Sequence, residues 1–194
     1  MINQINKKYK IILASGSPRR QELLKELGLE FEVNPVNVEE LFPEGLQKEE
    51  IAVYLSELKA LAFDFSTLCE NCLVITADTI VCLDDEILPK PKDTEEASLF
   101  LNKLSGKSHD VITGCTFRTK DKMRSFYSDT KVFFKTLTQT EIDYYIKNYE
   151  PFDKAGAYGI QEWIGLTGIE KIEGSYFNVV GLPVQKLYTE LLKF

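Results

Sequence analysis

The chain has 194 residues and a formal net charge of −7, because 30 aspartate and glutamate residues outnumber 23 lysine and arginine residues. At this length a globular fold buries roughly 70% of the unfolded chain's surface, so its core needs no metal or disulfide. The acidic balance excludes broad electrostatic binding to duplex nucleic acid or to an anionic membrane, and no apolar run approaches the roughly 18–20 residues of a membrane-spanning helix.

Strands and helices alternate along the first half of the chain. Short apolar runs rich in β-branched residues predict strands, and apolar residues that recur every three or four positions predict amphipathic helices. Ser17 is a suitable N-cap for the first helix, Pro18 suits its first position and Gly28 can end it. The predicted elements are, in order, a strand at 9–14, a helix at 18–27, a strand at 31–36, a helix at 48–63 and a strand at 73–83.

The second half of the chain continues this alternation. Asp93 is a suitable cap for one helix, and Thr138 forms a capping box with Glu141 for another. Between residues 151 and 161, a loop that contains glycine has the composition of a functional loop. The predicted elements are a helix at 94–104, strands at 111–119 and 125–137, a helix at 138–149, strand segments on both sides of 174–183, and a helix from Pro183 onward.

This order of elements predicts an α/β fold with a central mixed β-sheet and helices packed on both sides. We find no internal repeat, low-complexity tract or linker, so residues 1–194 are expected to form a single domain. The beginning of the chain lacks the long apolar region of a signal peptide, and the protein is therefore expected in the cytoplasm.

The four cysteines and the single histidine limit the kinds of catalytic and metal site that the chain can form. All four cysteines are expected to be reduced, and Cys69 and Cys72 form a C-x-x-C motif without the second close pair that a zinc site requires. A redox motif would open a helix after a strand, whereas this one precedes a strand. His109 is expected at the surface or at a strand edge rather than as a catalyst, so acid, base and metal chemistry depends on carboxylates.

Residues 15–20, with the sequence SGSPRR, combine a turn of small residues with the start of a helix. Such a turn presents backbone N–H groups and the positive end of the helix dipole, which favours an anion. Arg19 and Arg20 add guanidinium groups that match phosphate oxygens, so the expected anion is a phosphate. An ordinary capped helix with two surface arginines would have the same sequence, and this segment alone does not decide between the two.

Asp78 is the most informative residue, because a carboxylate inside an apolar strand is costly to bury unless it is paired, binds a metal or lines a cleft. Metal-assisted phosphate chemistry requires carboxylates that hold Mg²⁺ or Mn²⁺, cations that neutralise phosphate oxygens, and one carboxylate that deprotonates water. Each candidate could also be an ordinary solvated surface group. Only if the fold brings these side chains together do they indicate a catalytic site. The candidates beside Asp78 are Thr79, the acidic Glu39 and Glu40, and the cationic Lys59 and Lys90.

With these residues in view, the chain resembles the Maf family of nucleoside triphosphate pyrophosphatases. The matching motifs extend in order over essentially the whole chain, and the first, third and penultimate are together highly specific. Thr76 and Pro89 stand where glycine is expected, which affects backbone freedom rather than functional groups. The motifs are 15–20 (SGSPRR), 59–60 (KA), 77–79 (ADT), 90–91 (KP), 104–106 (LSG), 153–161 (DKAGAYGIQ) and 174–183 (GSYFNVVGLP).

The resemblance implies a Maf-like and inosine triphosphate pyrophosphatase-like fold with a cleft between two lobes. It also implies hydrolysis of a nucleoside triphosphate between the α and β phosphates with a divalent cation, Mg²⁺ or Mn²⁺. Asp78 matches the family's proton acceptor and, with Glu39, a metal ligand, although the segment around Glu39 fits the family only loosely. The positions implied to bind substrate are Ser15, Arg19, Arg20, Lys59, Thr79, Lys90 and Gln161.

Arg20, Thr79 and the ending at 159–161 resemble the branch of the family that hydrolyses dTTP and UTP, rather than the branch that acts on 7-methylguanosine triphosphate. The Gln161 amide could pair with the O4 and N3–H edge of uracil or thymine, and relaxed preference among pyrimidines is expected. Two alternatives stay open: a nucleotide-binding regulator of septum formation without turnover, and a pyrophosphatase for purines such as inosine triphosphate. A homodimer is also left open.

Overall fold

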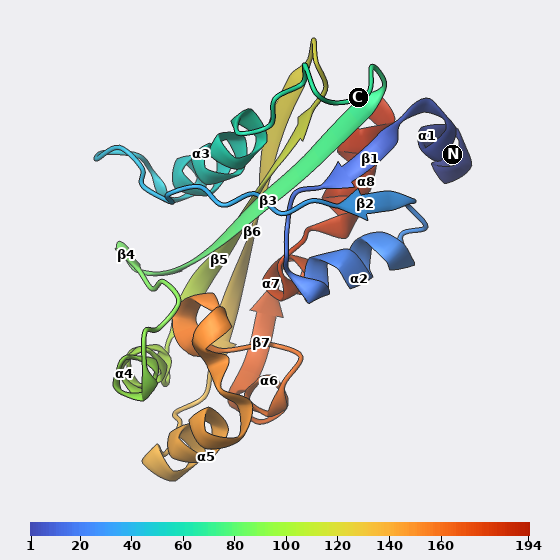
Figure 1. The fold of residues 1–194 in the computed structure, drawn as a ribbon. Helices are drawn as coiled ribbons and strands as arrows, with labels where there is room; N and C mark the ends of the chain where they lie inside the picture. The colour runs from blue at the N-terminus through green and yellow to red at the C-terminus, as the bar shows by residue number, and fades with distance from the viewer. The chain divides into compact units, whose positions relative to one another are not determined.

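A mixed β-sheet is the central element of the computed structural model, which describes residues 1–194 (Figure 1). Its strands are β1 (Lys10–Leu13), β2 (Phe31–Val33), β3 (Cys72–Leu83), β4 (Glu86–Ile87), β5 (Ser108–Arg118), β6 (Met123–Phe134) and β7 (Ile169–Glu173). β1 is parallel to β2 and to β3, whereas β4 pairs antiparallel with β3 and β7 pairs antiparallel with β6. The strand order is β2-β1-β3-β5-β6-β7.

Helices alternate with these strands, which confirms the predicted α/β class and its mixed central sheet flanked by helices. None of the helices is both long enough and apolar enough to cross a membrane. They are α1 (Ile2–Lys8), α2 (Pro18–Glu26), α3 (Lys48–Leu61), α4 (Thr94–Leu104), α5 (Gln139–Tyr149), α6 (Trp163–Gly168), α7 (Tyr176–Val180) and α8 (Val184–Lys193), with short 3₁₀ turns η1 (Pro151–Asp153) and η2 (Ala155–Ala157).

The chain folds into two compact units. The first unit comprises residues 1–78, 113–128 and 181–194, and the second comprises residues 79–112 and 129–180. The long strands β3, β5 and β6 each contribute residues to both units. Each unit is described by itself below.

In the first unit, alternate residues of β3 face helix α3. Side chains of a strand alternate between the two faces of a sheet, so Cys72, Val74, Thr76 and Asp78 share one face. Thr76 Oγ1 donates a hydrogen bond to the carbonyl oxygen of Ser56 in α3 at 2.6 Å. The periodicity of β3 therefore places Asp78 on the face that α3 covers.

Helix α3 lies directly against β5 at Gly114. A Cβ atom added at Gly114 would lie 2.1 Å from the carbonyl oxygen of Ala52, so a larger residue would displace the helix. One turn further along, the hydroxyls of Ser56 and Thr116 form a hydrogen bond of 2.8 Å. These contacts hold the helix that carries Lys59 close to the sheet.

In the second unit, the predicted helix caps are confirmed. Asp93 accepts a hydrogen bond from the backbone N–H of Glu96 at 2.8 Å and caps α4. Thr138 and Glu141 form the capping box of α5, since each side chain accepts from the other residue's backbone N–H. Both caps satisfy N–H groups that have no partner within the helix.

The prediction that His109 lies at the surface is wrong, because the residue is 2% exposed. Its Nε2 lies 2.7 Å from the Tyr158 hydroxyl, its ring stacks on Phe134, and its Nδ1 has no hydrogen-bond partner. Burial lowers the pKa of His109 to about 4, which favours the neutral imidazole. The sequence near His109 does not reveal this burial because Tyr158 lies far along the chain.

The prediction of reduced cysteines is wrong for one pair. Cys69 and Cys72 form a disulfide with a Cα–Cα distance of 5.2 Å, whereas Cys82 and Cys115 are buried, reduced thiols as predicted. The C-x-x-C spacing allows this bond because a turn before β3 brings the two residues together, with the Cys72 N–H donating to the Cys69 carbonyl at 3.1 Å.

The two ends of the chain also differ from the sequence predictions. Helix α1 was not predicted, because its sequence is mostly polar and only Ile5 is buried. Residues 176–180 form the short helix α7, and Pro183 is followed directly by α8, so the strand expected after 174–183 is absent. Short segments of this kind depend on tertiary contacts rather than on periodicity.

Candidate active site

The turn between β1 and α2 carries the first candidate residues. The N–H of Ala14 donates to the carbonyl of Ile75 at 2.9 Å, so the chain leaves the sheet beside β3. Ser15 is buried, and its Oγ accepts from the N–H of Ser17 at 3.3 Å. Ser17 is the N-cap of α2 as predicted, but its side chain makes no capping hydrogen bond. The first N–H groups of α2 are therefore suited to an anion.

Arg20 links this turn to the strand that carries Asp78. Its Nη1 donates to the carbonyl of Ala77 at 2.7 Å and to Ser15 Oγ at 3.3 Å, and its Nε donates to the carbonyl of Gly181 at 2.8 Å. Burial lowers the pKa of Arg20 and the negative charge of Asp78 opposes that shift, so the guanidinium stays cationic. The structure thus brings Ser15, Arg20 and the Asp78 strand together.

Asp78 is buried in β3 because a lysine from α3 pairs with it. Its side chain is 10% exposed and forms an ion pair with Lys59, whose side chain is 11% exposed. Lys59 Nζ also lies 2.7 Å from Oε1 of Glu40, which is 47% exposed. A buried carboxylate requires such a partner, and the pair accounts for the charge inside an apolar strand. Glu40, rather than the exposed Glu39, contacts Lys59.

The carboxylates do not form a resident metal cage. No group of three or more His, Cys, Asp or Glu side chains is arranged to hold a metal ion. Mg²⁺ is often held by only one or two carboxylates together with the phosphates of a nucleotide. Glu39 is exposed in the loop between β2 and α3.

In the second unit, Lys90 is exposed in the turn at 89–91. The N–H of Gly156 donates to the carbonyl of Leu88 at 3.0 Å, which fastens the loop at 151–161 to this turn. Gly156 has a φ of +70°, and a Cβ there would lie 2.9 Å from the Val81 side chain, so only glycine fits.

Lys154 is the main charged residue that the sequence reasoning did not single out. Its side chain is 9% exposed, and its Nζ lies 2.6 Å from Asp153 Oδ1 and 3.0 Å from Glu162 Oε1. Glu162 also accepts a hydrogen bond from the Tyr145 hydroxyl, which itself accepts from the N–H of Gly159 at 3.0 Å. Burial raises the pKa of Tyr145, so the phenol stays protonated and donates. The acidic Asp153 next to Lys154 is the signal that the sequence offered.

The remaining candidates lie at less buried positions. Thr79 follows Asp78 in β3 and is half-buried, Gln161 is exposed at the end of the loop, and Arg19 is half-buried in the first turn of α2. In the first unit, Arg20 contacts Ser15 and the carbonyl of Ala77, and Lys59 pairs with the neighbouring Asp78. These contacts define the candidate active site of this unit.

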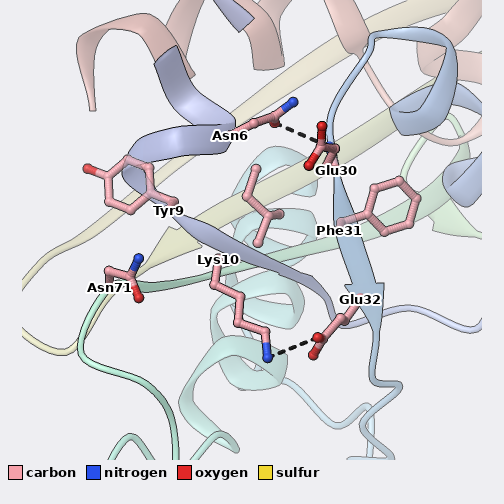
Figure 2. A pocket seen from close by; sticks show the side chains of 8 residues that line it. Asn6, Tyr9, Lys10, Glu30, Phe31, Glu32 and Asn71 are labelled. Carbon is pink, nitrogen blue, oxygen red and sulfur yellow. Dashed lines mark hydrogen bonds and ion pairs between the residues drawn. The ribbon is translucent and has the colours of Figure 1, made fainter. Parts of the chain in front are cut away.

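A separate cavity of about 360 Å³ lies where β1 and β2 begin (Figure 2). Figure 2 shows the ion pair between Lys10 and Glu32, whose charged atoms are 2.9 Å apart, and the contact between Asn6 and Glu30. The lining residues are Asn6, Tyr9, Lys10, Ile11, Glu30, Phe31, Glu32 and Asn71. None of them is a candidate from the sequence, and ligands of parallel sheets bind beyond the carboxyl ends of the strands rather than where the strands begin.

Comparisons with known proteins match nearly the whole chain. Residues 10–194 match the family model described as "Maf-like protein". A relative from Flavobacterium psychrophilum named "dTTP/UTP pyrophosphatase" is 56% identical over 94% of this chain and 93% of its own. Relatives of the same name from Phocaeicola vulgatus and Christiangramia forsetii are 54% and 50% identical, over 96% and 98% of this chain and 96% and 97% of their own. A solved structure titled "The structure of the Staphylococcus aureus Ham1 protein" has a TM-score of 0.44 at 19% identity, over 64% of this chain and 71% of that chain.

Proposed function

The chain belongs to the Maf family, and on that premise we propose that it hydrolyses dTTP, UTP and modified pyrimidine analogues between the α and β phosphates. The products are a nucleoside monophosphate and pyrophosphate. The full-length relatives named dTTP/UTP pyrophosphatase support this activity. The observation in the structure that carries it is the ion pair of Asp78 with Lys59 on the strand that Arg20 joins to the turn at residues 15–20.

The turn at residues 15–20 binds the triphosphate. The N-terminal N–H groups of α2 point toward the turn, and the Ser15 hydroxyl and the two arginines add donors to them. Such donors favour phosphate oxygens over other anions because charge-assisted and bidentate hydrogen bonds are the strongest available. Lys59, which already lies between two carboxylates, adds a third phosphate-binding cation.

Asp78 acts as the general base. Its carboxylate accepts a proton from water, the water oxygen attacks the α phosphorus, and the bond from that phosphorus to the bridging oxygen breaks, so pyrophosphate leaves. The neighbouring Lys59 ammonium stabilises the negative charge of Asp78 and fixes its orientation. General-base catalysis of this kind typically contributes 10²–10⁴-fold to a rate.

A divalent cation, Mg²⁺ or Mn²⁺, accompanies the substrate. Bound to the triphosphate, it neutralises charge on the phosphate oxygens. Asp78 and Glu39 are the residues that would contact it in this chain.

Arg19, Thr79 and Gln161 are the residues that recognise the substrate. Gln161 presents both an acceptor and a donor, which complements the O4 and N3–H edge of uracil or thymine. Lys90 contacts the phosphates from its turn at 89–91. We assign residues 1–194 to one Maf-like domain that works in the cytoplasm, as a monomer or a homodimer, without a nucleic-acid or membrane partner.

The test incubates the purified chain with Mg²⁺ or Mn²⁺ and with dTTP, UTP, CTP or inosine triphosphate. We expect equal amounts of monophosphate and pyrophosphate, formed fastest from dTTP and UTP. Faster turnover of inosine triphosphate would assign a purine preference instead. Orthophosphate as the first product would refute cleavage between the α and β phosphates. Tight nucleotide binding without any product would favour a regulator, such as one of septum formation.

A further inference from the structure

The disulfide between Cys69 and Cys72 plays no part in the proposed hydrolysis. It closes a short ring around Glu70 and Asn71, immediately before β3. The other two cysteines are buried, reduced thiols, and burial raises the pKa of the Cys115 thiol to about 12. A thiol in that state is inert, so any thiol chemistry of the native chain belongs to the first pair.

The two sulfurs of this bond differ in access. Cys72 is 2% exposed and packs in an apolar cluster with Ile12, Ala14 and Val74, whereas Cys69 is exposed. A thiolate from solution therefore reaches the Cys69 sulfur and not the Cys72 sulfur. This asymmetry between an accessible and a shielded sulfur defines the direction of attack.

The bond also contributes little to holding the fold together. The stabilisation that a disulfide gives by restricting the unfolded chain grows with the length of the closed loop, and this loop is minimal. The segment before it has other anchors, because Arg118 Nη1 donates to the carbonyls of Ala60 and Phe63 at 2.7 and 3.1 Å and its guanidinium lies over the Phe65 ring. Opening the disulfide therefore leaves the fold intact.

We propose that the disulfide of Cys69 and Cys72 is a dithiol–disulfide exchange site whose co-substrate is a dithiol. One thiolate of the dithiol attacks Cys69 Sγ, the bond between the two sulfurs breaks, and Cys72 leaves as a thiolate that takes a proton. The second thiol of the dithiol then attacks the dithiol sulfur that is bonded to Cys69. Cys69 leaves as a thiolate and takes a proton. The protein gains two electrons and two protons, and the dithiol becomes a disulfide.

A dithiol is required because the Cys72 thiol stays next to Cys69. When a monothiol attacks Cys69, Cys72 attacks the mixed disulfide in turn and expels the monothiol, which restores the ring. A dithiol avoids this reversal because its second thiol competes with Cys72 for the mixed disulfide in an intramolecular reaction. The cytoplasmic location proposed above supplies such thiols, and disulfides that occur there are usually transient.

Reduction changes the surface at one place. The carbonyl of Asn71 accepts a hydrogen bond from the N–H of Lys10 at 3.1 Å, and Asn71 lines the cavity where β1 and β2 begin (Figure 2). Opening the ring releases the segment that holds Asn71, so the exchange alters the wall of this cavity while the residues of the proposed active site keep their contacts.

The first experiment counts thiols by alkylation with iodoacetamide and mass spectrometry of the native full-length chain. We expect no label without reductant, and after dithiothreitol a rapid label on the exposed Cys69 followed by a slower label on the buried Cys72. At the same total thiol concentration, 2-mercaptoethanol should give less than about a tenth of that labelling. Two labels before any reductant, equal labelling by both reagents, or no labelling after dithiothreitol would each overturn the proposal.

A matched pair of variants tests the direction of attack. Cys72→Ala leaves the exposed Cys69 alone, and Cys69→Ala leaves the buried Cys72 alone. Cys72→Ala should react with 5,5′-dithiobis(2-nitrobenzoate) at least about tenfold faster than Cys69→Ala, because only an accessible thiolate reacts quickly. Equal rates, or the reverse order, would contradict attack at Cys69. If either variant does not fold, the alkylation pattern of the unmodified chain still decides the proposal.

Discussion

Each unit of this protein buries one lysine between two carboxylates, and the two clusters differ in what surrounds them. In the first unit, Lys59 contacts Asp78 and Glu40, and its side chain is 11% exposed. In the second unit, Lys154 contacts Asp153 and Glu162, and its side chain is 9% exposed. The chain thus contains two clusters in which a lysine with a similarly buried side chain pairs with two carboxylates.

The difference lies in the other bonds that the carboxylates make. Glu162 is also bonded to the Tyr145 hydroxyl, which accepts from the N–H of Gly159, so the second cluster holds a loop in place. Asp78 instead sits in the middle of a strand, next to the carbonyl that Arg20 binds. A charge cluster linked to the backbone of its own loop acts as scaffold, whereas a carboxylate beside cations and an anion-binding turn is suited to chemistry.

Asp78→Asn should produce the largest effect. We expect kcat/KM for dTTP to fall by about 10³-fold, because the amide cannot accept the proton from water. The free energy of unfolding should fall by less than the about 3–5 kcal/mol that is typical when one partner of a buried ion pair is removed, since Lys59 keeps Glu40 as a partner. Pyrophosphate release and urea unfolding measure the two quantities, and Asp121→Asn in an exposed turn is the matched control. Retained turnover would remove Asp78 from the role of base.

Lys154→Met should reduce stability rather than remove a reacting group. Loss of one partner from a buried ion pair costs about 3–5 kcal/mol, and we expect about 3 kcal/mol because Glu162 is 24% exposed and partly solvated. Urea unfolding measures this, with Lys147→Met at an exposed position of α5 as the control. A loss no larger than that of the control would contradict the scaffold role of the second cluster.

The second unit should also lose stability in acid through His109. Its pKa is about 4 in the folded chain and about 6.5 in the unfolded chain, so the unfolded state binds the proton first as the pH falls. The free energy of unfolding should therefore be constant above about pH 6.5 with respect to His109. It should fall by about 3 kcal/mol between about pH 6.5 and pH 4. His109→Gln should lack this component in urea unfolding at pH 7 and pH 4. An equal pH dependence in both proteins would rule it out.

Gln161→Leu should produce the smallest effect. The residue directly precedes Glu162, so the second cluster holds the loop that ends in this amide. Loss of hydrogen bonds to the base should lower kcat/KM for UTP by about tenfold, with a smaller change for inosine triphosphate. Competition between the two substrates in one reaction measures the ratio. An unchanged ratio would show that the base is recognised elsewhere.

Local signals in the sequence predicted much of this structure. The apolar pattern of β3, the caps of α4 and α5 and the proline at the start of α2 act within a few residues, so they can be identified without the fold. The burial of Asp78 followed from its place in an apolar strand.

The features that were missed depend on contacts that hydrophobic periodicity does not reveal. The burial of Lys154 requires Glu162, and that of His109 requires Tyr158. Neither neighbour could be identified from periodicity. The disulfide was missed because the C-x-x-C spacing alone fits thiols as well as a bond.

Hydrolysis of dTTP in ¹⁸O-labelled water is the most direct test of the proposed chemistry. If water is activated by Asp78 and attacks the α phosphorus, mass spectrometry will find the label in the thymidine monophosphate and none in the pyrophosphate. Label in the pyrophosphate would mean attack at the β phosphorus and would contradict the account.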